Sequence, residues 1–597
     1  MDYDTTNYLS LATGVNTPFR LQQPIPVTID LLSSVLCCTP RNVKFILRKL
    51  EEQGFITWQP GRGRGHKSRL LFMRSIEEVV EGAFEQLLRK GKIKQGIELI
   101  ANCAVDEGFR ARLMALLNKQ MGFVSEAESP SGLDVLRITL NRQMDKLDPA
   151  HVFTAFDAYI IAQITSTLVY YDGHKGRFRP GLAHMWEHNE AYTSYTFYLR
   201  KGVRFHHGRT LTSRDVKATF QRLQELGSTA AVHYKDIAHV ELGGDYRITF
   251  ELSRPNRFLL HLFSCVHMSI VPAEGDFAKD SIGTGPYRLL ALNEDVLVLE
   301  ANDHYYGIRP LLDRVEIWYL PEAASSVREY RLKESEPEVL SAPEDDYTID
   351  YTAMGCRYLL FNFSRQGVQQ QLSFRQAIRT LYDPQAMIRE LGGRRVRPAS
   401  SFLPWKSAAE TWMETDTEHA LESARQLLKE SGYQGETLTL AHNAKHVETE
   451  EAEWLKARAA QVGLRMELYP QTDYDKEDLR LHADLVITEE LLEDDWQWGM
   501  IHFFKNGSNS LYHLLLDKQR LLLEEELESF YELNYEERTK LLIQVEERMR
   551  EQCWLLHGCH INKTAQLGPN LSGLHTSSFG FMDISKLWIK TSPMQEA

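Results

Sequence analysis

Hydrophobic positions between residues 28 and 54 recur with the period of an α-helix, in two blocks separated by a cysteine pair. The first block runs from Thr28 to Leu36, and Thr28 can cap it. The second runs from Thr39 to Gly54, with a threonine for the N-cap, proline in the first turn and glycine just past the end. Its core-facing positions are Val43, Ile46, Leu47 and Leu50. The pattern predicts two short helices joined by a tight turn.

After residue 54 the spacing of the apolar residues changes from helical to strand-like. Two apolar runs, within residues 55–58 and 70–73, flank a loop of glycines and cations, GRGRGHKS. This arrangement is typical of a β-hairpin with a long basic tip. Two helices, a turn and a basic hairpin in this order predict a winged helix-turn-helix. The loop also approaches the phosphate-loop motif, but it leads into a predicted strand instead of a helix, so nucleotide binding is disfavoured.

Charge indicates what this segment binds. The whole chain has a net charge of -14, yet residues 40–74 hold nine cations and two anions, a local charge of +7. Because the local field steers a polyanion, we expect double-stranded DNA as a partner, with a solvated basic face on a structural unit as the alternative. The expected base-reading side is Thr39, Arg41, Asn42 and Lys44, with Arg48 on the same face; the expected wing contacts are Arg62, Arg64, Lys67 and Arg69.

The remaining sequence separates into a helical stretch and a long mixed region. Residues 76–123 have helical periodicity, and their apolar face could bury against the neighbouring domain or, less favoured, dimerise. Small polar residues at 125–132 indicate a boundary. From Leu133 onward strands and helices mix, which predicts an α/β architecture. The expected domains are a winged helix-turn-helix at 1–74, a helical linker at 75–131 and a large domain at 132–597.

Several functional classes lack support in the sequence. The N-terminus has neither a basic nor an apolar signal region, and no run of about 18 apolar residues occurs, so we expect a cytoplasmic protein without membrane insertion. Seven cysteines without a framework spacing fit reduced thiols. Cys553, His557, Cys559 and His560 match no standard zinc spacing. With no catalytic motif, we predict no enzyme, no cofactor and no metal.

The mixed region resembles a known family. Residues 180–223, PGLAHMWEHNEAYTSYTFYLRKGVRFHHGRTLTSRDVKATFQRL, resemble the signature of family 5 extracellular solute-binding proteins, the peptide- and nickel-binding receptors of ABC importers. The segments GTGPYR at 283–288, LLFNFS at 359–364 and FRQAIRTLYD at 374–383 follow in the family's order. The resemblance implies a multidomain α/β protein with a bilobed, periplasmic-binding-protein-like (type II) domain. Lobe I is expected at about 132–348 plus 499–597, and lobe II at about 349–498.

The N-terminal domain, taken together with the receptor-like region, makes the family resemblance more specific. A winged helix carrying CCTPRNV and GRGRGHKSRL, joined to this receptor domain, is similar to the SgrR-type transcriptional regulators. That resemblance implies a cytoplasmic DNA-binding regulator that senses a small solute, such as a sugar phosphate or a peptide. The alternative is an oligopeptide-type substrate-binding protein of an ABC importer, with an N-terminal module that does not bind DNA. The oligomeric state stays open, a homodimer on an inverted repeat being one alternative.

Candidate cleft residues follow from the family resemblance and from what a solute site requires. In peptide-binding relatives an aspartate of this region pairs with the ligand's amino terminus, and Asp494 or Asp495 would align with it, although here both precede Trp496 instead of following it. A solvated acidic loop is the alternative. Tyr170, Tyr171 and Trp405 are candidate aromatic platforms, with core packing as the competing role, and Trp496 beside the aspartates is the sixth candidate ligand residue.

Overall fold

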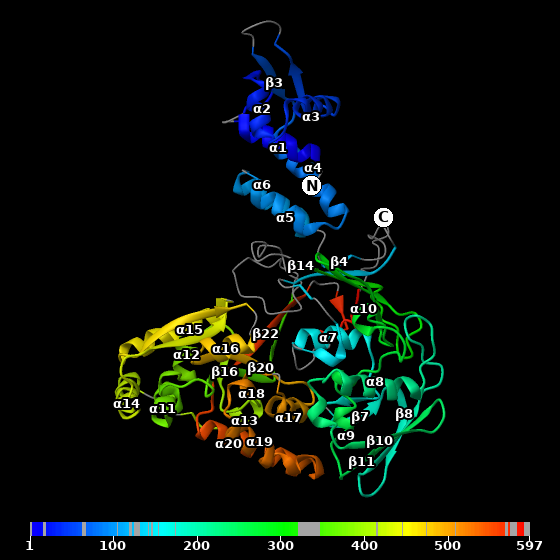
Figure 1. The fold of residues 1–597 in the computed structure, drawn as a ribbon, viewed down its shortest axis with the longest axis vertical. Coiled ribbons are helices and arrows are strands. Elements are labelled where there is room, and N and C mark those ends of the chain that lie inside the picture. The colour runs from blue at the N-terminus through cyan, green and yellow to red at the C-terminus, as the bar shows by residue number, and fades with distance from the viewer. Residues whose placement is uncertain are drawn as a thin grey trace. The chain divides into compact units, whose positions relative to one another are not determined.

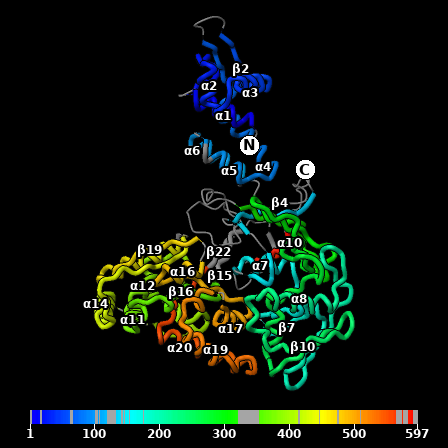
Figure 2. The backbone as a smooth tube through the Cα atoms, viewed as in Figure 1, coloured from blue at the N-terminus to red at the C-terminus, as the bar shows by residue number. Residues whose placement is uncertain are grey.

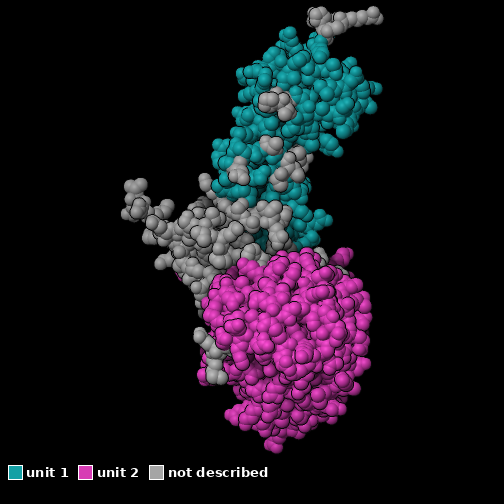
Figure 3. Space-filling view, turned by 90° about the vertical axis from the view of Figure 1, so that its left-hand side faces the viewer, with its two compact units in different colours: residues 1–143, 291–298, 315–330 teal, residues 144–290, 299–314, 331–597 magenta. Residues whose placement is uncertain are grey.

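A computed structural model gives the structure of the chain. It describes residues 3–15, 19–61, 67–103, 105–118, 122–124, 132–140, 143–144, 147–152, 154–173, 175–319, 347–412, 416–444, 446–472, 475–507, 509–567, 571–573 and 582–589. The chain divides into two compact units (Figure 3). The first unit comprises residues 1–143, 291–298 and 315–330, and the second comprises residues 144–290, 299–314 and 331–597.

The first unit begins with a winged helix-turn-helix, as predicted (Figure 1). Its helices are α1 (Tyr3–Val15), α2 (Ile29–Val35) and α3 (Pro40–Glu52), and its strands are β1 (Ile25–Val27), β2 (Ile56–Gln59) and β3 (Ser68–Phe72). The three strands form an antiparallel sheet in the order β1-β3-β2. Buried side chains of α3 and of the hairpin share one hydrophobic core, so the helix and the wing form a single packed domain.

The predicted caps set the limits of α2 and α3. The Thr28 hydroxyl accepts a hydrogen bond from the Leu31 N–H at 3.2 Å, and the Thr39 hydroxyl accepts one from the Asn42 N–H at 3.4 Å. Each bond satisfies a backbone donor that the first helical turn leaves without a partner. Gly54, with φ of 70°, follows α3 in the left-handed region that glycine adopts without strain.

The helical stretch consists of three helices, α4 (Ile76–Arg89), α5 (Ile93–Asn102) and α6 (Glu107–Asn118). Their buried side chains belong to the same hydrophobic core as the winged helix. Gly91, with φ of 69°, allows the chain to turn between α4 and α5. Strands β4 (Gly122–Val124), β5 (Val135–Leu140) and β14 (Arg314–Tyr319) follow, with neighbours in the order β14-β5-β4.

One half of the second unit, coloured cyan to green in Figures 1 and 2, is built on an antiparallel four-stranded sheet in the order β10-β11-β9-β8. Its helices are α7 (Ala155–Ile164), α8 (Ser213–Glu225), α9 (Leu259–Leu262) and α10 (Phe277–Asp280). Its strands are β6 (Val169–Asp172), β7 (Arg177–Pro180), β8 (Ala183–His188), β9 (Ser194–Leu199), β10 (Ile237–Leu242) and β11 (Arg247–Leu252). Strands β12 (Tyr287–Leu292) and β13 (Val296–Ala301) each have residues in both units. The predicted strand with inward Tyr195, Phe197 and Leu199 is β9, and all three are buried.

The other half is built on a mixed sheet in the order β19-β18-β20-β16-β21, beside a three-stranded sheet β15-β22-β17. The strands are β15 (Tyr347–Thr352), β16 (Gly355–Phe361), β17 (Arg395–Pro398), β18 (Thr437–Asn443), β19 (Arg465–Gln471), β20 (Leu485–Leu491), β21 (Leu555–His557), β22 (Cys559–Leu567), β23 (Leu571–Ser572) and β24 (Trp588–Ile589). The helices are α11 (Leu372–Leu381), α12 (Pro384–Leu391), α13 (Pro404–Ala408), α14 (Thr417–Glu430), α15 (His446–Gln461), α16 (Lys476–His482), α17 (Trp496–Lys505), α18 (Ser510–Leu514), α19 (Asp517–Glu526) and α20 (Tyr535–Glu551).

Strands β18, β19 and β20 run parallel, whereas β16 is antiparallel to β20 and β21. Helices alternate with the parallel strands, which is the α/β arrangement that the sequence predicts. Buried side chains of both halves form one hydrophobic cluster. Among the described residues, no helix is long and apolar enough to cross a membrane.

Candidate functional site

The exposed side of α3 carries the predicted polar residues. Val43, Leu47 and Leu50 turn into the core, and the opposite side leaves Arg41, Asn42, Lys44 and Arg48 exposed. Thr39 is also exposed, and its hydroxyl caps the helix. The Arg48 Nε donates to Glu52 Oε1 at 2.8 Å on the helix surface. The structure therefore brings the five predicted α3 positions onto one solvent-facing surface.

Phe45 was not among the predicted base-reading residues, although it lies on the same surface. It is 64% exposed, which is unusual for so large an apolar side chain. It lies one helical turn after Arg41 and one before Arg48, so cations flank it along the helix. The sequence signal was present, because Phe45 falls outside the apolar stripe that the core residues define.

The predicted wing is described only in part. Lys67 and Arg69 are exposed, and Arg69 pairs with Gln59 across the hairpin. Arg62 and Arg64 lie outside the described residues. The chain continues from Lys67 into strand β3 and not into a helix, so the structure agrees with the sequence in disfavouring a phosphate loop here.

A cavity of about 450 Å³ lies in the second unit. Four of the six predicted ligand residues line it: Tyr170, Tyr171, Asp494 and Asp495. The other two, Trp405 and Trp496, are not among its lining residues. Their rings are 6.1 Å apart, and Trp405 is 50% exposed. The cavity draws its lining from several distant segments, which include α7, residues 165–167, strand β6, the loop at 493–495 and residues 583–586.

Asp495 anchors the acidic loop. It caps α17, accepting a hydrogen bond from the Trp498 N–H at 3.2 Å. Its other oxygen lies 2.5 Å from Nδ1 of His261, which comes from α9. The same imidazole contacts Arg538 of α20 at 3.4 Å. Asp495 is buried, and these bonds use both of its oxygens, so its role includes joining the two halves of the second unit.

Glu493 is a cleft residue that the sequence reasoning missed. It lines the cavity, and its Oε1 accepts a hydrogen bond from Nε1 of Trp498 at 3.2 Å. Burial, and then the neighbouring charges of Asp495 and Asp494, raise the pKa of Glu493 to about 8. A carboxyl group with this pKa is largely protonated at neutral pH, and a cation nearby would favour its ionised form.

The two tyrosines have different surroundings. The Tyr170 hydroxyl lies 3.0 Å from the hydroxyl of Tyr306. The Tyr171 ring packs 5.1 Å from the His261 ring, and burial raises the pKa of its hydroxyl. Both side chains are partly exposed instead of fully buried, which leaves surface for a ligand.

The turn after β6 touches the acidic loop. A Cβ atom added to Gly173 would lie 2.5 Å from the carbonyl oxygen of Asp494, closer than any real Cβ contact. Only glycine therefore allows the backbone of one half of the unit to approach the other this closely.

The cysteine and histidine cluster near residue 557 has protein partners. His557 Nε2 lies 3.1 Å from Glu546 Oε1. His560 uses both ring nitrogens, with the Gly355 carbonyl at 2.6 Å and the Ser407 hydroxyl at 2.8 Å. Across the described part of the chain, no group of three or more histidine, cysteine or acidic side chains is arranged to hold a metal ion.

Two known families match different parts of the chain. Residues 177–510 match the family described as "Bacterial extracellular solute-binding proteins, family 5 Middle". Residues 5–127 match the family described as "Sugar transport-related sRNA regulator N-term". The first match covers more than half of the chain, and the second covers the winged helix and α4–α6.

Curated relatives match different shares of the chain. The protein YhjP of Bacillus subtilis (strain 168) is 30% identical over 577 residues, which are 94% of this chain and 96% of YhjP. The HTH-type transcriptional regulator SgrR of Yersinia enterocolitica is 29% identical over 371 residues, 61% of this chain and 63% of that regulator. SgrR of Pectobacterium atrosepticum is 29% identical over 392 residues, 64% of this chain and 66% of that protein. The matches thus span just under two thirds of either regulator.

Solved structures show the same fold at low identity. A dipeptide binding protein from Pseudoalteromonas sp. SM9913, in complex with Met-Leu, has a TM-score of 0.65 at 18% identity and covers 76% of this chain and 100% of its own. NikZ from Campylobacter jejuni, in complex with Ni(L-His), has a TM-score of 0.63 at 17% identity, covering 76% and 99%. The chain therefore belongs to the family 5 bacterial extracellular solute-binding proteins, and it carries an N-terminal domain of the SgrR type.

Proposed function

We propose that this protein is a transcriptional regulator that binds double-stranded DNA through its winged helix and senses a small solute in the cleft of its second unit. The observation that carries the proposal is the exposed basic surface of α3. A rigid, capped helix presents three cations and an aromatic ring to solvent while its other side is buried. This is what a recognition helix needs to enter the major groove.

Roles on the DNA follow from the chemistry of each side chain. Arg41 and Lys44 can reach guanine edges or phosphates, and Asn42 can pair with adenine. The exposed ring of Phe45 is suited to the methyl group of thymine. Lys67 and Arg69 of the hairpin would contact phosphates. A DNA-binding regulator acts where the chromosome is, so the proposal places the protein in the cytoplasm.

The charge of the cleft supports a solute with a cationic group. Four carboxyl groups line the cavity, those of Asp494, Asp495, Asp583 and Glu493, of which Glu493 is largely protonated at neutral pH unless a cation is near, against the two cations Arg179 and Lys586. Lys586 Nζ already pairs with Asp583 at 2.9 Å. The negative charge of a phosphate group would be repelled by these carboxylates. An amine would pair with them, and this attraction would offset the cost of burying its own charge. An amino-acid derivative or a short peptide therefore fits better than a sugar phosphate.

Sensing requires that the solute bind two states of the protein with different affinity, because a ligand that binds both equally shifts nothing. The loop at 493–495 is the segment whose position we expect to differ between the two states, since it lines the cavity and also lies against the turn at Gly173. A homodimer on an inverted repeat would place half-sites roughly 34 Å apart, or a multiple of that spacing.

The test is fluorescence anisotropy of the full-length protein on DNA from upstream of its own gene, with scrambled DNA of equal length as the control. We expect selective binding whose log K falls linearly with log salt. Equal binding to both DNAs at every salt concentration would contradict the proposal. The same assay then screens cationic and anionic solutes for a shift of the curve.

A second function is favoured by one observation, the fold shared with binding proteins of importers. In that case the protein would deliver a solute to a transporter, and its N-terminal domain would not bind DNA. Cell fractionation separates the two proposals. Recovery outside the cytoplasmic membrane would favour the transport role, and recovery with the chromosome would favour the regulator.

A further inference from the structure

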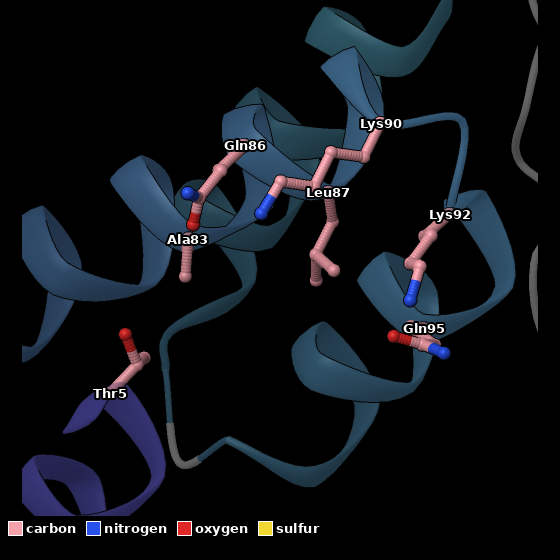
Figure 4. A pocket seen from close by; sticks show the side chains of 7 residues that line it. All are labelled: Thr5, Ala83, Gln86, Leu87, Lys90, Lys92 and Gln95. Carbon is pink, nitrogen blue, oxygen red and sulfur yellow. The ribbon is translucent and has the colours of Figure 1, made fainter. Parts of the chain in front are cut away.

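Charged side chains lie beside a hollow in each unit, but their exposure differs. The hollow of the first unit measures about 260 Å³ and lies between α1, α4 and α5, with Thr5, Lys90 and Lys92 among its lining residues (Figure 4). Both lysines are exposed, so water can solvate their charges. At the cleft of the second unit, Asp495 is only 6% exposed, and Arg538, which is linked to it, only 4%. A buried charge needs a partner, so the partners of Asp495 and Arg538 indicate what holds them there.

His261 lies between these two charges. Its Nδ1 lies 2.5 Å from Oδ2 of Asp495, and its Nε2 lies 3.4 Å from Nη2 of Arg538. A guanidinium group can only donate hydrogen bonds, so Nε2 is the acceptor and the ring proton is on Nδ1, which donates to the carboxylate. It follows that the imidazole is neutral and orients Asp495.

The three side chains come from both halves of the second unit. Asp495 is the N-cap of α17 and Arg538 belongs to α20, both in the half that contains the mixed sheet. Arg538 Nε donates to Gln497 Oε1 at 3.0 Å, which connects α20 to α17 within that half. His261 belongs to α9 of the other half, where the Phe258 ring stacks on it at 4.2 Å. One half therefore inserts a neutral ring between an acid and a base of the other.

Arg538 has no carboxylate as a direct partner. Its guanidinium donates to Gln497 and to the Leu533 carbonyl, the latter at 2.8 Å, and contacts His261. Among the described residues, no carboxylate lies within ion-pair distance of it. Burial lowers the pKa of Arg538 to about 10, and the charge of Asp495 is the main influence that opposes this shift. Asp495 is thus its compensating charge, and a direct pair would bring the two charges closer and attract them more strongly.

We propose that His261 is a positioning residue of the solute site, and that Asp495 exchanges His261 for Arg538 when the two halves separate. We call closed the arrangement in which His261 lies between the two charges. In the open arrangement His261 withdraws with its own half, and the Arg538 side chain turns to pair with Asp495 directly. Both arrangements give Asp495 a partner, which provides the two discrete states that a switching element requires.

The link to the solute rests on the proposed function. A cationic group bound at Asp495 would neutralise it, so Arg538 would gain nothing by turning toward it. The solute would then stabilise the closed arrangement, which is the difference in affinity that sensing requires. The exchange of partners is a property of the solute-free protein. It can therefore fail while DNA binding and solute binding stand, and the reverse also holds.

The test is amide hydrogen exchange of the solute-free, full-length protein at Arg257, whose N–H donates to Tyr531 O at 2.7 Å across the two halves. Separation of the halves breaks this bond, so the exchange rate reports the open arrangement. Arg538→Gln deprives the open arrangement of its ion pair, whereas the closed one loses mainly a contact with a neutral ring. We expect exchange at Arg257 to slow about fivefold, the factor that corresponds to a solvated ion pair.

Arg538→Met removes the same charge with an apolar side chain, so it should also slow the exchange, and it serves if the glutamine variant does not fold. Arg538→Lys keeps the charge and should stay within about twofold of the wild type. The matched control is Arg548→Gln, the same change on the same helix, because Arg548 pairs with Glu526 at 2.7 Å within one half. It should leave exchange at Arg257 unchanged.

His261 is tested with two variants. His261→Leu removes both ring nitrogens, so exchange at Arg257 should become about tenfold faster, as expected when a buried carboxylate loses its donor. His261→Gln offers an N–H to Asp495 and an oxygen to Arg538, so it should stay near the wild type. The exchange of partners is overturned if both neutral variants of Arg538 speed the exchange, since Arg538 would then only support the closed interface. The positioning role is overturned if His261→Gln exchanges as fast as His261→Leu.

Discussion

The basic surface of α3 and the acidic cleft of the second unit are built in opposite ways. The surface lies on one helix of 13 residues, exposed to solvent and held by a local cap and a local core stripe. The cleft combines short segments from distant parts of the chain, and its carboxyl groups are close enough to change one another's pKa. Changes on the surface should therefore alter binding alone, whereas changes in the cleft should also alter stability.

The largest effect is expected from removing the charges of the surface. Arg41→Ala, Lys44→Ala and Arg48→Ala together should weaken DNA binding by about two orders of magnitude and lower the salt slope by about 0.9 for each phosphate that the variant no longer neutralises. The thermal unfolding temperature should barely change, because these side chains are exposed. Fluorescence anisotropy across a salt series measures this. Arg89→Ala, an exposed change on α4, is the control, and an equal loss there would contradict the assignment.

In the cleft, Gly173→Ala should have the next largest effect. Its methyl group would collide with the carbonyl of Asp494, so the turn and the acidic loop must separate, at a cost of about 1–3 kcal/mol. Hydrogen exchange of residues 493–498 should become faster, while DNA affinity of the solute-free protein stays within twofold of the wild type. Gly507→Ala is the matched control, because its added methyl meets only an ordinary contact at 3.8 Å. Unchanged hydrogen exchange in Gly173→Ala would show that the close contact between Gly173 and Asp494 does not hold the loop in place.

Glu493 gives a pH-dependent test. Its pKa is raised from 4.5 to about 8, so the folded protein keeps a proton that the unfolded chain releases, and stability falls as pH rises between these two values. Glu493→Gln should therefore stabilise the second unit by about 2 kcal/mol at pH above 8 and have little effect near pH 4. Thermal unfolding at both pH values measures this. If Glu493→Gln stabilises the protein equally at both pH values, the gain comes from better packing of the glutamine side chain and not from removal of the buried charge.

The raised pKa of Glu493 also predicts how pH changes the affinity for the solute. A cationic ligand favours ionised Glu493, so its affinity should rise as pH increases toward 8 and level off above it. An anionic solute would show the opposite trend, which would refute the proposed ligand class. Calorimetric titration with a solute from the anisotropy screen provides the measurement.

The smallest effect should come from Phe45. Phe45→Ala should weaken specific DNA binding about tenfold, near the lower end of the discrimination that one base contact supplies. Replacing thymine by deoxyuridine in the site removes only the methyl group, so it should weaken the wild type and leave Phe45→Ala unaffected. Equal losses in both proteins would place the methyl contact elsewhere. A loss of binding to scrambled DNA as well would indicate that the ring supports the helix and does not read a base.

Much of the first unit could be predicted because its determinants are local. Thr39, Pro40 and Gly54 delimit α3 by hydrogen bonding and backbone conformation within a few residues. The apolar stripe then determines which side is exposed. Phe45 falls outside this stripe, and the structure leaves its ring exposed, although it was not chosen as a base-reading residue.

The cleft could be predicted only in part. Tyr170, Tyr171, Asp494 and Asp495 were chosen from residue type and family resemblance, and the fold brings them to one cavity. Trp405 and Trp496 were chosen by the same criteria but lie outside the lining. The partners that determine the chemistry, His261 for Asp495 and the approach of Gly173, come from segments that no local pattern connects.

The sequence by itself determined the helices and the hairpin of the first unit, which side of α3 is apolar and which is charged, and the family. Caps, periodicity and charge act over one or two helical turns, and they can be read without knowing which distant segments meet. Only the tertiary structure decided that Glu493 is a carboxyl group with a raised pKa, and that Thr5 and two lysines border one hollow. The physical reason is that burial and electrostatic coupling depend on neighbours in space, which chain order does not specify.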